Sequence, residues 1–334
     1  MKLGIVFAWG CAFMTALCLP ARTGGESAAA ETFTARPAVW VRLGDLDACL
    51  ASLEGREEIL HRVMVSDHCI MPDGVRVGAR VEGGEALARR AVAWCQARDL
   101  PVYMGLGNYG GGFSRPEIIS AMLADPARRR DHIAEITAAA ARLDYTGVDL
   151  DYENLPPSDR ASFSRFVTEL ARALTRAGRR LDVTVPPKFS EPGWPQTRAY
   201  DWEHLSRHAD RVNVMCYDWT VRTGPPGPII PLGVTRKVVR FIRTLPHPGR
   251  FWIGHPAYGN DWTQKASGAW RGRYAGARDL QARARRHGAP IRHAAGGWGG
   301  FETGPFAHYR YRDASGRHEV WYGDARSYAA TLEA

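Results

Sequence analysis

The sequence predicts an α/β fold built as a TIM-type (β/α)8 barrel. From Ala38 onward, short apolar runs alternate with longer amphipathic segments, which is typical of a parallel sheet covered by helices. The chain has 334 residues, of which 45% are hydrophobic, and this is enough for one large core. An N-terminal leader over residues 1–30 would leave about 300 residues, the usual size of one barrel.

Short apolar runs that end at turns or loops predict seven barrel strands. The expected strands span residues 38–43, 60–66, 101–106, 147–153, 181–185, 211–217 and 251–254. A helix is expected over 85–97. Further helices are expected after a capping box at Ser114–Glu117, after Asp125-Pro126 and after Ser158.

Residues 263–323 interrupt the alternation and predict a small α+β insertion between strands seven and eight. Residues 277–287 are expected to form a basic helix, and 307–312 and 318–322 a hairpin. A last helix is expected near Ala325. No strand is apparent after it, so the barrel is expected to lack a clear eighth strand at its C-terminus. The predicted barrel domain, including the insertion, spans 31–334.

The N-terminal 30 residues have the form of a signal peptide, with Lys2 before an apolar run and Ala28-Ala29-Ala30 as a cleavage site. We therefore expect an exported protein, periplasmic, cell-wall-associated or extracellular, with no stable membrane span after processing. Export permits a disulfide, and Cys49 and Cys95 are the candidates. No CxxC pair is present, and the His204/His208 pair lacks a third ligand, so no metal site is expected.

The net charge of +9 and the pI of 9.4 fit contact with an anionic polymer such as cell wall, but fit an arginine-rich proteome equally well. The arginines are scattered, and no basic stripe with interleaved aromatic residues appears. Nucleic acid is therefore not an expected partner.

The most informative stretch is the acidic strand at 147–153. Alternate residues of a strand face the same way, so Asp149, Asp151 and Glu153 share one face. Burial and mutual repulsion raise the pKa of such carboxyls, which can keep one protonated near neutral pH as a general acid. Glu153 is the candidate acid, Asp151 can share its proton, and Asp149 would hold Asp151. A solvated acidic edge strand is the less favoured alternative.

Other candidate residues lie at the same rim, where barrel active sites form. Tyr217 and Asp218 close strand six, on which Met215 shares the face of Tyr217. Asn108 and Tyr109 begin a glycine-rich loop that lacks either nucleotide fingerprint and is interpreted as a wall of the binding site.

Residues 146–153 resemble the signature of glycoside hydrolase family 18, Asp-Gly-x-Asp-x-Asp-x-Glu, with Thr146 in place of the first Asp. The resemblance runs from about Ala38 to the C-terminus and is strongest to the bacterial branch that includes spore-cortex-lytic enzymes. Further matching segments are Asn108-Tyr109, Pro186-Pro187-Lys188, Met215-Cys216-Tyr217-Asp218, 224–228, Tyr258-Gly259, Asp261-Trp262 and Val320-Trp321-Tyr322.

The resemblance implies retaining, substrate-assisted hydrolysis of β-linked N-acetylglucosamine, without metal or organic cofactor. It makes Glu153 the proton donor, Asp151 the residue that orients the acetamide, and Asp149 the residue that tunes Asp151. Tyr217 would bond the acetamide oxygen. The family's eighth strand carries a tryptophan under the sugar, and this sequence has no such strand. The expected substrate-binding residues are Asp218, Met215, Asn108, Tyr109, Tyr258, Trp219 and Trp262.

A monomeric N-acetylglucosaminidase acting on peptidoglycan is the leading interpretation. A chitinase or chitooligosaccharide hydrolase is the second enzymatic one. A non-catalytic sugar-binding barrel is the rival from another class, and the presence of Glu153 weighs against it.

Overall fold

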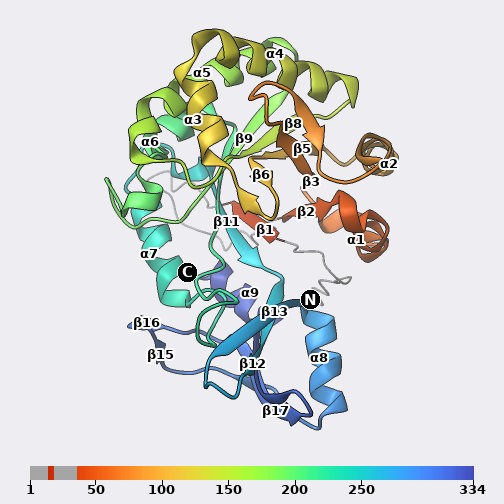
Figure 1. Ribbon diagram of the computed structural model, residues 1–334, viewed down its shortest axis with the longest axis vertical. Helices are drawn as coiled ribbons and strands as arrows, with labels where there is room; N and C mark the ends of the chain where they lie inside the picture. The colour runs from red at the N-terminus through yellow and green to blue at the C-terminus, as the bar shows by residue number, and fades with distance from the viewer. Residues whose placement is uncertain (1–13, 19–35) are drawn as a thin grey trace, which may run out of the picture.

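The computed structural model describes residues 14–18 and 36–334, and the barrel forms most of that part of the chain (Figure 1). The predicted leader lies mainly outside the described residues, so its cleavage stays a prediction. Among the described residues, no helix is long and apolar enough to cross a membrane.

Seven parallel strands form the barrel wall in the described part of the chain, as the sequence predicts. They run in the order β2-β3-β5-β8-β9-β10-β11, with β4 (Val77–Ala79) added antiparallel to β3. Their bounds are β2 Ala38–Arg42, β3 Arg62–Ile70, β5 Val102–Gly107, β8 Gly147–Asp151, β9 Arg180–Val185, β10 Arg211–Val214 and β11 Phe251–Pro256.

Helices cover the outside of this wall (Figure 1). The helix over 85–97 and the one after Asp125 are confirmed; Asp125 caps its helix by accepting from the Ala127 and Arg128 N–H groups. The capping box at Ser114 is wrong, because Arg115 occupies the N-cap and makes no side-chain bond there. The helices are α1 Leu46–Leu53, α2 Gly84–Gln96, α3 Pro116–Ala124, α4 Pro126–Arg142, α5 Arg160–Arg176, α6 Trp202–His208 and α7 Leu232–Ile242.

The parallel wall is incomplete between β11 and β2, as expected from the missing eighth strand. In this gap, β1 (Met14–Cys18) runs antiparallel to both neighbours, with Thr15 opposite His255 of β11 and opposite Val39 of β2. A strand edge left unpaired exposes backbone groups that need hydrogen-bond partners. The segment 14–18, which belongs to the predicted leader, therefore completes the ladder antiparallel to the other strands, and cleavage of the leader would leave the gap open.

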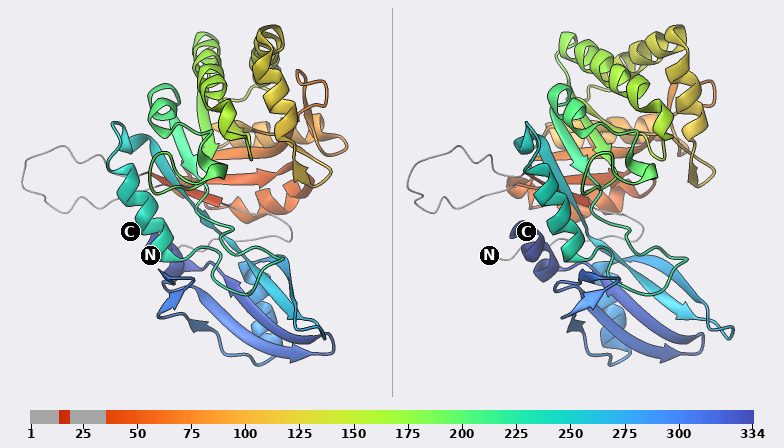
Figure 2. Two further views of the ribbon diagram at one scale, coloured as in Figure 1. Left: turned by 60° about the vertical axis from the view of Figure 1, so that its left-hand side comes forward. Right: turned by 90° about the vertical axis from the view of Figure 1, so that its left-hand side faces the viewer.

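The predicted insertion forms a separate antiparallel sheet beside one end of the barrel (Figure 2). Its hairpin joins β17 (Ala307–Asp313) to β18 (Gly316–Tyr322), as the turn at 313–316 predicts. The remaining elements are β6 Tyr109–Gly110, β7 Phe113–Ser114, β12 Tyr258–Gln264, β13 Trp270–Gly276, α8 Ala277–Arg286, β14 Arg292–His293, β15 Gly297–Trp298, β16 Phe301–Glu302 and α9 Ala325–Leu332.

The proposed disulfide between Cys49 and Cys95 is wrong. Cys95 is a buried free thiol on α2, and burial raises its pKa to about 12, whereas Cys49 is disulfide-bonded elsewhere. Both cysteines lie on helix faces turned into the core, where a cysteine packs as a small apolar side chain.

Candidate active site

The acidic strand β8 has the predicted alternation. Val148 and Leu150 are fully buried on the face that packs against the helices. Asp149 and Asp151 occupy the other face, which lines the barrel interior, and Glu153 follows just past the strand end. The strand ends two residues earlier than expected, so it carries two of the carboxyl groups, and the third follows it at the C-terminal rim, where barrel active sites form.

Asp149 is fully buried and is held by side chains from three other strands, β2, β9 and β10. Its Oδ2 accepts from Trp40 Nε1 at 2.7 Å, and its Oδ1 accepts from Thr184 Oγ1 at 2.8 Å and from Asn213 Nδ2 at 3.1 Å. Burial raises the pKa of Asp149, and these bonds oppose the rise. These bonds fix Asp149 in position two residues before Asp151, and a role of Asp149 in holding Asp151 stays a prediction.

Asp151 lies nearer the C-terminal rim than Asp149 and accepts fewer hydrogen bonds. Tyr109 Oη donates to its Oδ2 at 3.2 Å, while its Oδ1 is buried without a hydrogen-bond partner in the described part of the chain. Burial raises the pKa of Asp151 well above its usual range, and the charges of Glu153 and Asp149 raise it further. Burial therefore disfavours the ionised form of Asp151 in the free protein, and one of its oxygens is left for a ligand.

Glu153 is positioned through its backbone. Asn108 donates from Nδ2 to the Glu153 carbonyl at 3.0 Å and accepts from the Glu153 N–H at 2.9 Å. Burial and the charge of Asp218 raise the pKa of Glu153, while a bond from Tyr109 lowers it. Asn108 is itself buried, so it acts on the position of Glu153 rather than at an open surface.

Tyr217 and Asp218 lie beyond the end of β10. This strand ends at Val214, whereas it was expected to run to residue 217. Tight turns follow, with the N–H of Tyr217 bonded to the carbonyl of Met215. Burial and the charges of Asp151 and Glu153 raise the pKa of Tyr217 well above its usual range, so its phenol stays a donor. Gly254 leaves room for the ring, since a Cβ there would lie 2.8 Å from Tyr217 Cε1.

Asp218 lies at the rim, where its carboxyl is partly buried, with a positive φ of 52°. Its Oδ1 accepts from Tyr258 Oη at 2.5 Å, and Tyr274 also bonds this carboxyl. Burial raises the pKa of Asp218, and both phenols lower it. The predicted residue Tyr258 thus reaches the site through Asp218, and the insertion strands β12 and β13 supply this support. Tyr274 was not predicted.

Three predicted sugar contacts receive less support. Trp262 is fully buried, with its Nε1 3.0 Å from the Cβ that Gly272 would carry, so its expected stacking on a sugar is wrong. Trp219 is half-buried in an aromatic cluster with Phe189 and Phe301. Met215 is half-buried beyond the end of β10, so it does not continue the strand alternation on which its prediction depended.

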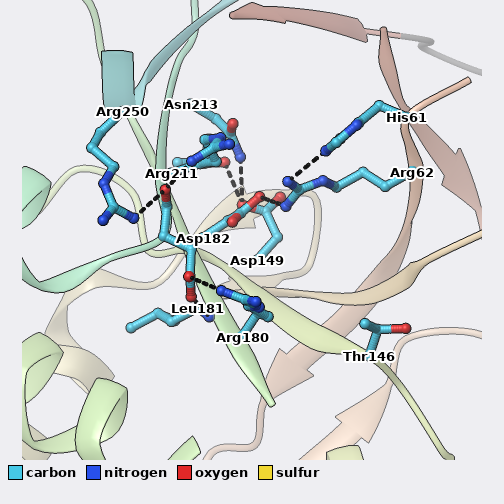
Figure 3. A network of polar contacts seen from close by, with 12 residues as sticks. His61, Arg62, Thr146, Asp149, Arg180, Leu181, Asp182, Arg211, Asn213 and Arg250 are labelled. Carbon is cyan, nitrogen blue, oxygen red and sulfur yellow. Dashed lines mark hydrogen bonds and ion pairs between the residues drawn. The ribbon is translucent and has the colours of Figure 1, made fainter. Parts of the chain in front are cut away.

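Asp182 on β9 is a further buried carboxyl, and unlike the acids of β8 it has a cationic partner among the described residues (Figure 3). Arg62 Nη1 lies 2.7 Å from Asp182 Oδ2, and both side chains are almost fully buried. The guanidinium also lies 4.5 Å from the Tyr103 ring centre and 5.0 Å from that of Trp252. Asp182 stands opposite Asp149 in the β8–β9 register.

The Arg62–Asp182 pair was not predicted, and neither were the partners of Asp149. All of these residues lie on strands far apart in the sequence, and only the register of the closed sheet brings them together. The one available signal was polar residues at inward positions of predicted strands, such as Asn213 beside Met215 and Tyr217.

A cavity of about 290 Å³ opens over Asp149, Asp151 and Tyr109. The described residues contain no group of three or more His, Cys, Asp or Glu that could hold a metal ion. Carboxyls with raised pKa values, flanked by phenols at the C-terminal rim of a barrel, are suited to general acid catalysis. Fold and site together define a barrel protein with acid–base groups gathered at its C-terminal rim.

Comparisons with known proteins narrow this class. The family model described as glycosyl hydrolases family 18 matches residues 89–329. YdhD of Bacillus subtilis, a "putative sporulation-specific glycosylase", is 31% identical over 239 residues, which are 71% of this chain and 55% of the relative. The cortical fragment-lytic enzyme of Bacillus anthracis is 27% identical over 235 residues, 70% of this chain and 53% of the relative.

A chitinase of Chromobacterium violaceum has a similar solved structure, with a TM-score of 0.73 and 25% identity over 87% of each chain. This chain spans about half the length of the two bacillus relatives. The chain belongs to glycosyl hydrolase family 18.

Proposed function

We propose that this chain hydrolyses β-linked N-acetylglucosamine in bacterial cell-wall peptidoglycan, with retention and with the substrate's acetamide as nucleophile. The observation that carries the proposal is Asp151 Oδ1, a buried oxygen without a partner among the described residues, next to Glu153. An acetamide N–H supplies the donor that this oxygen lacks. The names of the bacillus relatives, which refer to sporulation and to cortex lysis, support the wall glycan.

In this mechanism Glu153 gives its proton to the glycosidic oxygen as the bond to the anomeric carbon breaks. The acetamide carbonyl attacks that carbon, and Asp151 accepts the acetamide N–H, which stabilises the positive oxazolinium intermediate. Tyr217 donates to the acetamide oxygen before attack, and Asp149 holds Asp151 in orientation. Water, deprotonated by Glu153, then opens the intermediate, which restores the starting configuration.

A second candidate is hydrolysis of chitin or its oligosaccharides, which the structural similarity to a chitinase favours. Both polymers present N-acetylglucosamine to the catalytic pair, so the mechanism is the same for each. We propose further that the protein is exported, acts as a monomer, and meets its glycan at the wall or outside the cell.

Mass spectrometry of products from purified peptidoglycan and from chitin oligosaccharides tests the proposal, with Glu153→Gln as the matched control. We expect fragments ending in reducing N-acetylglucosamine from peptidoglycan, formed by the wild-type protein alone. Products from chitin alone would replace the proposal by the chitinase. Turnover by Glu153→Gln at the wild-type rate would remove Glu153 from the mechanism.

A further inference from the structure

The cavity beside the catalytic acids has a cationic wall that the mechanism does not use. Asp149, Asp151 and Tyr109 line one side of it. Arg42 and Arg80 also line this cavity, from the end of β2 and from the residue after β4. A site for uncharged sugars needs hydrogen bonds and aromatic faces, and gains little from two guanidinium groups.

Arg80 is brought to the cavity by the β3–β4 ladder. Its N–H donates to the carbonyl of Asp67 at 2.8 Å, one step beyond the His68–Ala79 pair. Asp67 has a φ of 76°, at the irregularity between Val65 and His68 in the pairing of β3 with β5. The guanidinium of Arg80 lies 5.4 Å from the ring centre of Tyr109, whose hydroxyl bonds Asp151. One aromatic ring separates Arg80 from the catalytic carboxyl.

The two arginines differ in their partners. Arg42 lies 3.3 Å from Asp45 and 3.7 Å from Asp67. Arg80 is exposed, and it forms no ion pair with any carboxylate in the described ranges. Because burial raises the pKa of Asp149 and Asp151, these two carboxyls of the opposite wall repel an anion less than two ionised carboxylates would.

We propose that Arg80 binds the carboxylate of an acidic sugar that adjoins the N-acetylglucosamine in the catalytic site. The cavity therefore selects a glycan in which an N-acetylated sugar carries a free carboxylate, such as a muramic acid whose lactyl carboxyl bears no peptide, over the uncharged chitin polymer. Arg42, already held by Asp45 and Asp67, adds positive potential to the same wall. This inference rests on the proposed hydrolase function.

The test compares Arg80→Gln with Arg76→Gln. Arg76 is exposed just before β4, pairs with Asp73 and does not line the cavity, so it is a matched control. For each variant, kcat/KM is measured on peptidoglycan glycan strands freed of their peptides, on the same strands with their carboxyl groups converted to amides, and on chitin oligosaccharides. Arg80→Glu adds a reversal of charge.

We expect Arg80→Gln to lose about tenfold in kcat/KM on the carboxylate strands, the size of one hydrogen-bonded charge pair, and Arg80→Glu to lose more. Both should match the wild type on the amidated strands and on chitin, and Arg76→Gln should match it on all three. Equal losses on charged and uncharged glycans, or no loss on the charged one, would overturn the inference alone. A wild-type protein that cleaves none of the glycans would overturn the proposed function instead.

Discussion

The barrel interior contains two sets of buried carboxyls that differ in what faces them. At the lower, N-terminal end, Asp182 lies 2.7 Å from Arg62. At the C-terminal end, Asp151 faces phenols and other carboxyls, and no ion pair of it is found in the described part of the chain. Arg62 opposes the effect of burial on the pKa of Asp182, which rises to about 7, whereas that of Asp151 rises well above its usual range.

We infer that this difference separates a structural role from the proposed catalytic one. A buried carboxylate with a cation and a fixed geometry can stay ionised, and it joins strands β3 and β9 inside the barrel. A buried carboxyl without a cation is costly to ionise and is available for proton transfer. The two sets are linked through Asp149, which lies opposite Asp182 and below Asp151.

The largest expected effect is on kcat, from substitution of Asp151 at the C-terminal end of the barrel. Asp151→Asn should lower kcat on a cleavable glycan by about 10²–10³-fold, because it removes the charge that stabilises the intermediate. The melting temperature should stay the same or rise, since a buried acid is replaced by an uncharged amide. An Asp151→Asn protein with wild-type kcat would show that this carboxyl is not part of the mechanism.

At the other end, breaking the ion pair should cost stability. Arg62→Met should lower the free energy of unfolding at pH 8 by about 3–5 kcal/mol, because Asp182 is left as an unpaired buried charge. The double variant Arg62→Met/Asp182→Asn should recover most of the loss. Urea unfolding measures both, and a double variant no more stable than Arg62→Met would argue against the charge as the cause.

Stability should also depend on pH in a definite direction. The pKa of Asp182 is raised from its ordinary value of 3.8 to about 7, so the folded state binds this proton more tightly than the unfolded state. The free energy of unfolding should therefore fall as pH rises from about 4 to 7, and then level off for this group. The upper carboxyls change stability in the same direction, so the Arg62→Met/Asp182→Asn protein should show a shallower fall. If the free energy of unfolding of that protein fell equally steeply with pH, groups other than Asp182 would cause the pH dependence.

The smallest effect on stability is expected at the ion pair between Arg180 and Asp210. Arg180 lies on β9, as Asp182 does, but this pair is open to water. Arg180 and Asp210 approach to 2.8 Å, but the arginine side chain is 65% exposed. Arg180→Ala should change the free energy of unfolding by less than about 1 kcal/mol in urea. A loss as large as that of Arg62→Met would mean that burial does not govern the value of these pairs.

The strand alternation of β8 was enough to predict Asp149 and Asp151 on one face, because a period of two is a local property of the backbone, whereas Glu153 was expected on the same strand and lies beyond its end. The hairpin β17–β18 and the helix start at Asp125 were predicted for the same reason. Trp40, Thr184 and Asn213 were missed as partners of Asp149, because strand register over more than 30 residues of sequence brings them together.

The corrected predictions have a similar cause. Ser114 was expected to cap α3, but it lies in β7 and accepts from Asn154 at 2.7 Å instead. Trp262 was expected to meet sugar, but the neighbouring strand covers its ring at Gly272. In each case a long-range contact replaced the local role that the sequence favoured.

The most direct test replaces one carboxyl of each set by its isosteric amide. The kcat values of Glu153→Gln and Asp182→Asn are measured side by side on a glycan that the wild-type protein cleaves. We predict that Glu153→Gln loses about 10²–10⁴-fold, the usual contribution of a general acid, while Asp182→Asn stays within about fivefold of the wild type. Equal losses in the two variants, or wild-type turnover by Glu153→Gln, would contradict the division between a catalytic and a structural set of carboxyls.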